Sequence, residues 1–66
     1  MQISVNGETK TVSDGLTVAA LLTHLGVATG RVAVELNRQI VPKAEHGSAR
    51  LAEGDKVEIV SFVGGG

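Results

Sequence analysis

Residues 16–26 contain the helical pattern of this chain, and that pattern limits the folds open to it. Four apolar residues recur at the spacing i, i+3, i+4 and i+7 and so form one stripe of an α-helix: Val18, Leu21, Leu22 and Leu25. Thr17 stands where a side-chain oxygen can cap the first turn, and Gly26 stands where a helix ends in the left-handed conformation. A helix of about two to three turns needs another layer for its stripe, and we expect that layer to be a sheet.

The first strand pattern precedes this helix. Residues 1–5 alternate apolar and polar side chains, as a half-buried strand does. Asn6-Gly7 follows directly, and this dipeptide is a strong signal for a two-residue hairpin turn, because both positions tolerate positive φ. We therefore predict a polar return strand over residues 8–13, with Val12 as its core residue.

Three further strands are predicted after the helix. Residues 31–36 alternate again, and a short strand over 39–41 ends at Pro42, which suits a sheet edge. Residues 43–50 show no periodicity and are expected to form a surface loop, followed by Leu51 in the core. The last strand is predicted over residues 56–63.

The order of these elements is hairpin, helix, strand, short edge strand and final strand. If the final strand pairs beside the first, the result is one mixed sheet of four to five strands with one main helix across one face. The fold class is then α+β, a ubiquitin-like β-grasp roll. We expect one domain over residues 1–63 and a flexible glycine tail over residues 64–66.

Composition excludes several functions. The 66 residues contain six basic and seven acidic residues, spread along the chain, so no electrostatic surface for nucleic acid or an anionic membrane is expected. No apolar run reaches membrane-spanning length, and there is no cysteine, which favours a cytoplasmic protein without disulfides. A hydrophobic fraction of 42% is typical of a folded globule.

Candidate catalytic groups are weak. His24 and His46 have no partner at metal-ligand spacing, and we expect both to be solvated surface residues, with no metal site. The carboxylates fall at turns and on solvent faces, and no serine has a nucleophile motif or an adjacent base. An independent enzyme is therefore the least favoured class.

The C-terminal glycines carry the remaining signal. Gly64, Gly65 and Gly66 cannot join a core, but without Cβ atoms they can pass through a narrow channel and carry the Gly66 carboxylate roughly 10 Å beyond the last strand. The alternative is a frayed chain end with no role. Strand parity puts Val60 and Phe62 on the outer face of the sheet. Together with Val63 they would form a surface that binds a partner. The alternative is that Phe62 folds over the sheet edge.

Five stretches resemble the ThiS-type sulfur carriers of thiamine biosynthesis, a family of ubiquitin-like proteins. They are Asn6-Gly7, Leu16-Thr17-Val18 with Leu21-Leu22, Val34-Glu35-Leu36-Asn37 through Ile40-Val41-Pro42, Glu53-Gly54-Asp55 with Val57-Glu58-Ile59, and Val63-Gly64-Gly65-Gly66. The resemblance covers the whole chain. Paired terminal glycines alone are less specific, because ubiquitin and the small subunit of molybdopterin synthase share them.

The resemblance implies an ATP-dependent cycle with three partner proteins. An E1-like enzyme of the ThiF type would adenylate the Gly66 carboxylate, a persulfide protein would supply sulfur to form a thiocarboxylate, and a thiazole synthase of the ThiG type would take that sulfur. Gly64 and Gly65 would thread into the partners' active sites. The chain itself would bind no cofactor, since ATP belongs to the activating enzyme, and it would be a co-substrate rather than a catalyst.

Two other functions stay open at this point. A carrier of the same class could supply sulfur to molybdopterin or to tRNA thiolation. A member of another class, a non-covalent β-grasp interaction module, would bind through Val60, Phe62 and the outer sheet face. Deletion of Gly65 and Gly66 separates these classes, because only a carrier needs its terminal carboxylate.

Overall fold

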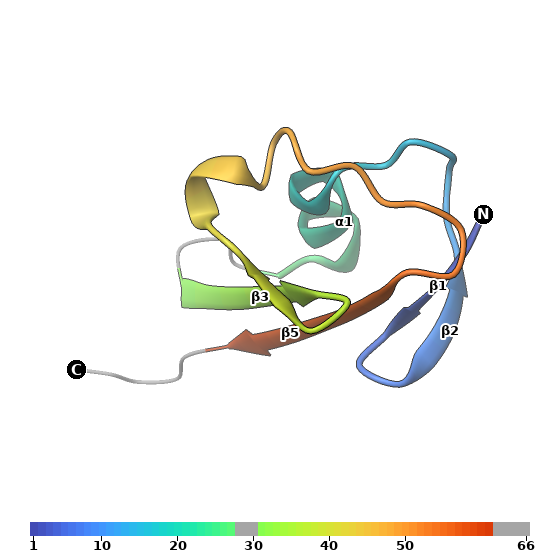
Figure 1. The fold of residues 1–66 in the computed structure, drawn as a ribbon, viewed down its shortest axis with the longest axis horizontal. Helices are drawn as coiled ribbons and strands as arrows, with labels where there is room; N and C mark the ends of the chain where they lie inside the picture. The colour runs from blue at the N-terminus through green and yellow to red at the C-terminus, as the bar shows by residue number, and fades with distance from the viewer. Residues whose placement is uncertain (28–30, 62–66) are drawn as a thin grey trace.

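The computed structural model describes residues 1–27 and 31–61, which form one sheet and one α-helix (Figure 1). The strands have the order β2-β1-β5-β3-β4 in the sheet. Their bounds are β1 Gln2–Val5, β2 Glu8–Thr11, β3 Val32–Leu36, β4 Gln39–Val41 and β5 Lys56–Ser61. β1 and β5 run parallel, whereas the other neighbours are antiparallel. The predicted mixed sheet, with the last strand beside the first, is confirmed.

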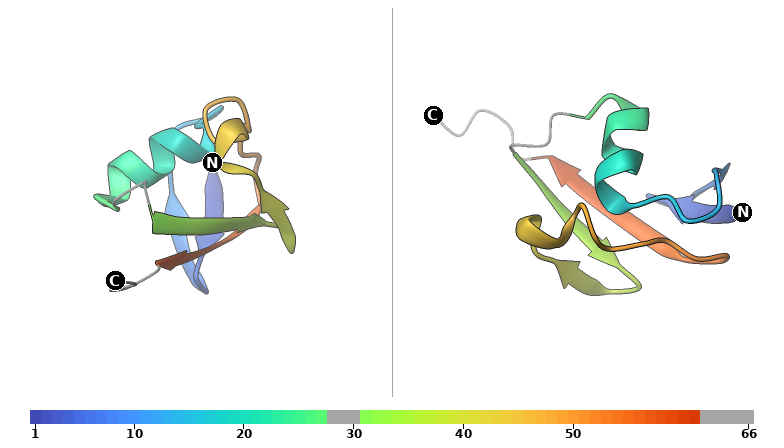
Figure 2. Two further views of the ribbon diagram at one scale, coloured as in Figure 1. Left: turned by 90° about the vertical axis from the view of Figure 1, so that its left-hand side faces the viewer. Right: turned by 90° about the horizontal axis from the view of Figure 1, so that it is seen from above.

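Helix α1, Val18–Leu25, lies across one face of this sheet (Figure 2). Both predicted caps are present: Thr17 Oγ1 accepts a hydrogen bond from the Ala20 amide at 3.1 Å, and Gly26 has φ 72°. The first three members of the predicted stripe are fully buried, and Leu25 is half-buried at the end of the helix. The stripe therefore packs on the sheet as its spacing predicts.

The core lies between α1 and the sheet. Its buried members come from β1, α1, β3, β5 and the connection before β5: Ile3, Val5, Val18, Leu21, Leu22, Val32, Val34, Leu51 and Val57. Leu51 occupies the core as predicted, with 4% of its surface exposed. Val12, the predicted core residue of the return strand, is half-buried and packs against the edge of the core. β2 is also shorter than predicted, because it ends at Thr11.

Two tight turns join the hairpins. Asn6 and Gly7 have φ of 50° and 86°, as the Asn-Gly signal predicts for the β1–β2 turn. Asn37 and Arg38 join β3 to β4 with φ of 52° and 71°. Both asparagines lie in the left-handed region, which Asn tolerates better than most residues.

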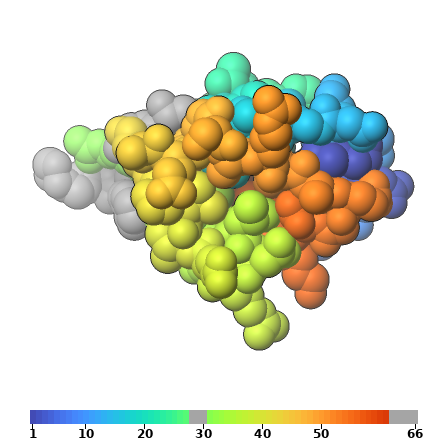
Figure 3. Space-filling model, turned by 45° about the horizontal axis from the view of Figure 1, so that its top comes forward, coloured from blue at the N-terminus to red at the C-terminus, as the bar shows by residue number. Residues whose placement is uncertain are grey.

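The connection over residues 42–55 corrects two predictions. A 3-10 helix, η2 (Lys43–Glu45), interrupts the predicted irregular loop, and His46 is buried rather than solvated, with 6% of its surface exposed. The His46 carbonyl accepts a hydrogen bond from the Ala19 amide at 2.8 Å. The Nε2 atom of the His46 ring lies 3.1 Å from the Val41 carbonyl oxygen. These contacts draw the connection onto the start of α1, and its atoms form a continuous yellow-to-orange band in Figure 3.

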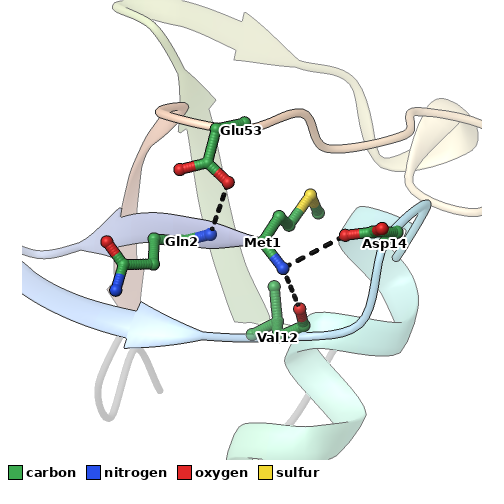
Figure 4. Close-up of polar contacts among 5 residues, drawn as sticks. All are labelled: Met1, Gln2, Val12, Asp14 and Glu53. Carbon is green, nitrogen blue, oxygen red and sulfur yellow. Dashed lines mark hydrogen bonds and ion pairs between the residues drawn. The ribbon is translucent and has the colours of Figure 1, made fainter.

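The start of β1 is fixed by polar contacts at the end of the sheet opposite to Ser61. The Met1 amino group donates to the Val12 carbonyl at 2.7 Å and to Asp14 Oδ1 at 3.1 Å (Figure 4). The Gln2 amide donates to Glu53 Oε1 at 2.9 Å. These bonds tie the start of β1 to the segment that follows β2 and to the connection that leads into β5.

Candidate functional site

β5 is the strand that leads toward the predicted functional tail. It lies between β1 and β3, and its pairing with β3 extends to the last described residue, Ser61, which is opposite Val32. The predicted site residues Phe62, Val63, Gly64, Gly65 and Gly66 lie outside the described residues. The structure therefore defines the strand from which the tail continues, and the proposed division at residue 63 stays a prediction.

The sheet face opposite α1 is the outer face. Val60 lies there with 55% of its surface exposed, as strand parity predicts, and it is opposite the half-buried Ala33 of β3. Ile40 of β4 is 65% exposed and pairs with Glu35, the residue that also pairs with Glu58 of β5. The outer face thus presents two exposed apolar side chains with carboxylates between them. We call Val60, Ala33 and Ile40 the outer apolar patch.

Two asparagines hold β5 near its two ends. Asn37 Oδ1 accepts from the Lys56 amide at 2.9 Å, and its Nδ2 donates to Asp55 Oδ1 at 3.0 Å. Asn6 Oδ1 accepts from the Ile59 amide at 2.8 Å, and its Nδ2 donates to the Ile59 carbonyl at 3.2 Å. The sequence predicts Asn6 only as a turn former, because the Asn-Gly signal reports backbone conformation and not what the side chain contacts.

The two histidines are not brought together as a site. His24 is exposed on α1, whereas His46 is buried in the connection before β5. A surface hollow of about 380 Å³ is lined by His24, by Thr11 at the end of β2, and by three residues between β2 and α1: Val12, Ser13 and Leu16. Among the described residues of that lining, His24 is the one titratable side chain, and it has no acid–base partner there.

No group of three or more His, Asp or Glu side chains within residues 1–27 and 31–61 is placed to hold a metal ion. Within the same ranges, no helix has the length and apolar character needed to cross a bilayer.

Comparison with known proteins decides the family. The model of the ThiS family matches residues 3–66. The chain belongs to the ThiS family. A crystal structure of the thiamine biosynthesis protein ThiS from Geobacter metallireducens has the same fold, with a TM-score of 0.86, 38% identity and full coverage of both chains. The predicted ubiquitin-like β-grasp fold is thereby confirmed.

Three relatives of this ThiS-family chain differ in length. The sulfur carrier protein ThiS of Bacillus subtilis is 35% identical over 65 residues, which are 97% of this chain and 98% of that protein. The thiazole synthase of Paramagnetospirillum magneticum is 48% identical over all 66 residues, and a thiazole synthase of Magnetococcus marinus is 42% identical. The chain spans 20% of the length of each thiazole synthase.

Proposed function

We propose that this chain is a sulfur carrier protein of thiamine biosynthesis, acted on by partner enzymes as a co-substrate. Its membership of the ThiS family over residues 3–66 is the observation that carries the proposal. The near-complete overlap with a relative named as a sulfur carrier supports it. The sequence after β5, which ends in Gly64, Gly65 and Gly66, supplies a side-chain-free end that can enter an active site.

The reacting group in this proposal is the α-carboxylate of Gly66. A carboxylate resists acyl transfer until it is activated. Its oxygen attacks the α-phosphorus of ATP on an E1-like enzyme of the ThiF type, and pyrophosphate leaves. The terminal sulfur of a persulfide then attacks the acyl carbon and expels AMP, and a thiol cleaves the resulting S–S bond to release the thiocarboxylate. ATP is bound by the activating enzyme, so the cycle needs no cofactor on this chain. The proposed location of the cycle is the cytoplasm.

A thiazole synthase of the ThiG type is the proposed acceptor of the sulfur. Two proteins named thiazole synthase contain a segment similar to all 66 residues of this chain. Two functions that occur within one polypeptide are commonly consecutive, and a covalent link raises the effective concentration of one for the other. This comparison favours thiamine biosynthesis over molybdopterin or tRNA thiolation as the pathway.

The outer apolar patch is the proposed docking surface for these partners, together with Phe62 and Val63. Val60 and Ile40 are 55% and 65% exposed on the sheet face that α1 leaves uncovered. A protein interface buries exposed apolar side chains of this kind and also contains charged groups, which here are the carboxylates between Val60 and Ile40. Val60 lies one residue before Ser61, so a partner that binds the patch is close to the point from which the tail continues.

The test is the intact mass of the chain after incubation with ATP, a ThiF-type enzyme and a persulfide donor. We expect a gain that corresponds to one oxygen replaced by sulfur, localised to Gly66 by fragmentation. Gly66→Ala should abolish the gain, because a methyl group on the α-carbon, next to the reacting carboxylate, obstructs a channel shaped for glycine.

Gly47→Ala is the matched control, because a Cβ built at Gly47 meets no atom within 4 Å and the substitution should leave conversion intact. Absence of the mass gain in the unmodified chain, under conditions that convert a known carrier, would overturn the proposal and favour the interaction module. Normal conversion of Gly66→Ala would also contradict it.

A further inference from the structure

The side chain of Asn6 replaces a peptide group in the parallel pairing of β1 with β5. The pairs Ser4–Lys56 and Val5–Val57 form this ladder, and the Asn6 amide continues it by donating to the Val57 carbonyl at 2.9 Å. At Asn6 the main chain leaves the ladder, because φ of 50° starts the hairpin turn into β2.

The Asn6 carboxamide then continues the pattern that the main chain has left. Its Oδ1 accepts from the Ile59 amide at 2.8 Å, and its Nδ2 donates to the Ile59 carbonyl at 3.2 Å. One carboxamide thus satisfies both backbone groups of Ile59 in the way a neighbouring strand would.

These two bonds matter because of where Ile59 lies in β5. The N–H and C=O of one strand residue point to the same side, so those of Ile59 point toward Asn6 and away from β3. On the β3 side the pairing continues to Ser61, opposite Val32. On the β1 side, Asn6 makes the side-chain contact nearest to the end of β5 among the hydrogen bonds of the described residues.

We propose that Asn6 is a positioning residue for sulfur transfer: it fixes the end of β5, and so the direction in which the chain leaves the sheet toward Gly66. This inference rests on the proposed carrier function. The tail must enter a partner's active site while the body is docked on that partner, so the angle at which the chain leaves the body affects how readily the carboxylate reaches ATP. An error of an ångström in the placement of reacting groups costs on the order of 10²-fold in rate.

Asn37 provides a matched comparison within the same strand. It has φ of 52°, its side chain also makes two hydrogen bonds, and it is exposed like Asn6. Its contacts are with Asp55 and Lys56, at the start of β5 rather than at the end. Loss of either carboxamide removes a similar set of contacts, but only the Asn6 contacts lie near the end of β5.

The experiment compares Asn6→Gly with Asn37→Gly. Glycine removes the carboxamide and accepts positive φ without strain. Each variant therefore loses its side-chain hydrogen bonds without added backbone strain. Release of pyrophosphate by the ThiF-type enzyme is measured at varied carrier concentration, at a temperature where circular dichroism shows both variants folded. We expect kcat to fall about tenfold for Asn6→Gly, with KM within about twofold of the unmodified chain. Asn37→Gly should change neither constant by more than about twofold.

Hydrogen exchange gives a local readout. The Ile59 amide should be protected in the unmodified chain and in Asn37→Gly, and should lose protection in Asn6→Gly. Asn6→Asp keeps the acceptor for the Ile59 amide but loses the donor to its carbonyl, so its kcat should lie between those of Asn6→Gly and the unmodified chain.

The outcomes separate the two proposals. If the unmodified chain releases pyrophosphate and the two glycine variants have equal kcat, Asn6 has only a structural role and the positioning inference is wrong. An Ile59 amide that exchanges freely in the unmodified chain would overturn it as well. If the unmodified chain is not activated at all under conditions that activate a known carrier, the proposed carrier function is wrong, and the positioning role that rests on it is wrong as well.

Discussion

Val34 and Val60 offer the sharpest test of how folding and docking are divided between the two faces of the sheet. Both are β-strand valines, in neighbouring strands β3 and β5, but Val34 is 0% exposed beneath α1 and Val60 is 55% exposed on the outer face. Val→Ala removes the same two carbons at each position. The two substitutions therefore differ in what surrounds the side chain and not in chemistry.

The expected loss of stability follows from burial. At Val34 two fully buried carbons contribute about 1.6 kcal/mol of transfer free energy, and the cavity that remains raises the loss to about 2–3 kcal/mol. That is roughly half the unfolding free energy of a domain of this size, and Tm should fall by about 10–20 °C. At Val60 less than half of the side chain leaves water, so the loss should stay below about 0.8 kcal/mol.

The KM of the partner enzyme should show the reverse order, with the larger change for the Val60 variant and none for the Val34 variant. Thermal and urea unfolding measure the first effect, and the KM of the ThiF-type enzyme for each variant measures the second at a temperature where both are folded. We expect Val60→Ala to raise KM about fivefold, as truncation of an interface residue does at a cost of roughly 1 kcal/mol, and Val34→Ala to leave KM unchanged. Equal shifts in Tm would refute the burial argument, and an unchanged KM for Val60→Ala would refute the docking surface.

Three further substitutions test the elements around α1. Thr17→Ala removes the helix cap and should lower the stability by about 1 kcal/mol, or roughly 4–8 °C in Tm. Thr23→Ala, on the exposed face of α1, should lower it by less than half of that. Equal shifts in Tm would contradict the capping role. Gly26→Ala forces a Cβ into φ 72° and should lower the urea midpoint by an amount equivalent to about 1 kcal/mol, unlike Gly47→Ala. His46→Ala should cost about 2 kcal/mol, because a 6% exposed ring and its bond to a carbonyl are lost; a neutral effect in urea unfolding would argue against its burial.

The sequence predicts the elements of this fold where the signal is local. Asn6-Gly7 specifies its turn because two consecutive positive φ angles exclude most residues, and Thr17 and Gly26 mark α1 because helix ends leave backbone groups that need particular partners. Parity along β5 places Val60 on the outer face because side chains alternate in a strand.

Features that depend on tertiary contact could not be predicted in this way. His46 lies in a segment without periodicity, and its burial results from contacts with Ala19 and Val41, which no local pattern reveals. The contacts of Asn6 with Ile59 join residues 53 positions apart, so they follow from the register of β1 on β5 and not from the turn itself. The roles of Gly64, Gly65 and Gly66 come from family resemblance and chemistry, and they stay predictions.

The central place of β5 also affects how the chain acquires its structure during synthesis. Among the five strands of the sheet, the one that separates β1 from β3 is synthesised last, and the β1–β5 pairs join residues that are more than 50 positions apart. Contacts between such distant residues slow folding, because a long loop must close before they form. A nascent chain that stops before Lys56 lacks the neighbour that both β1 and β3 require, so truncated chains should stay unfolded and available to proteases. Folding would then serve as a check that synthesis has reached the strand that leads toward the proposed reacting group.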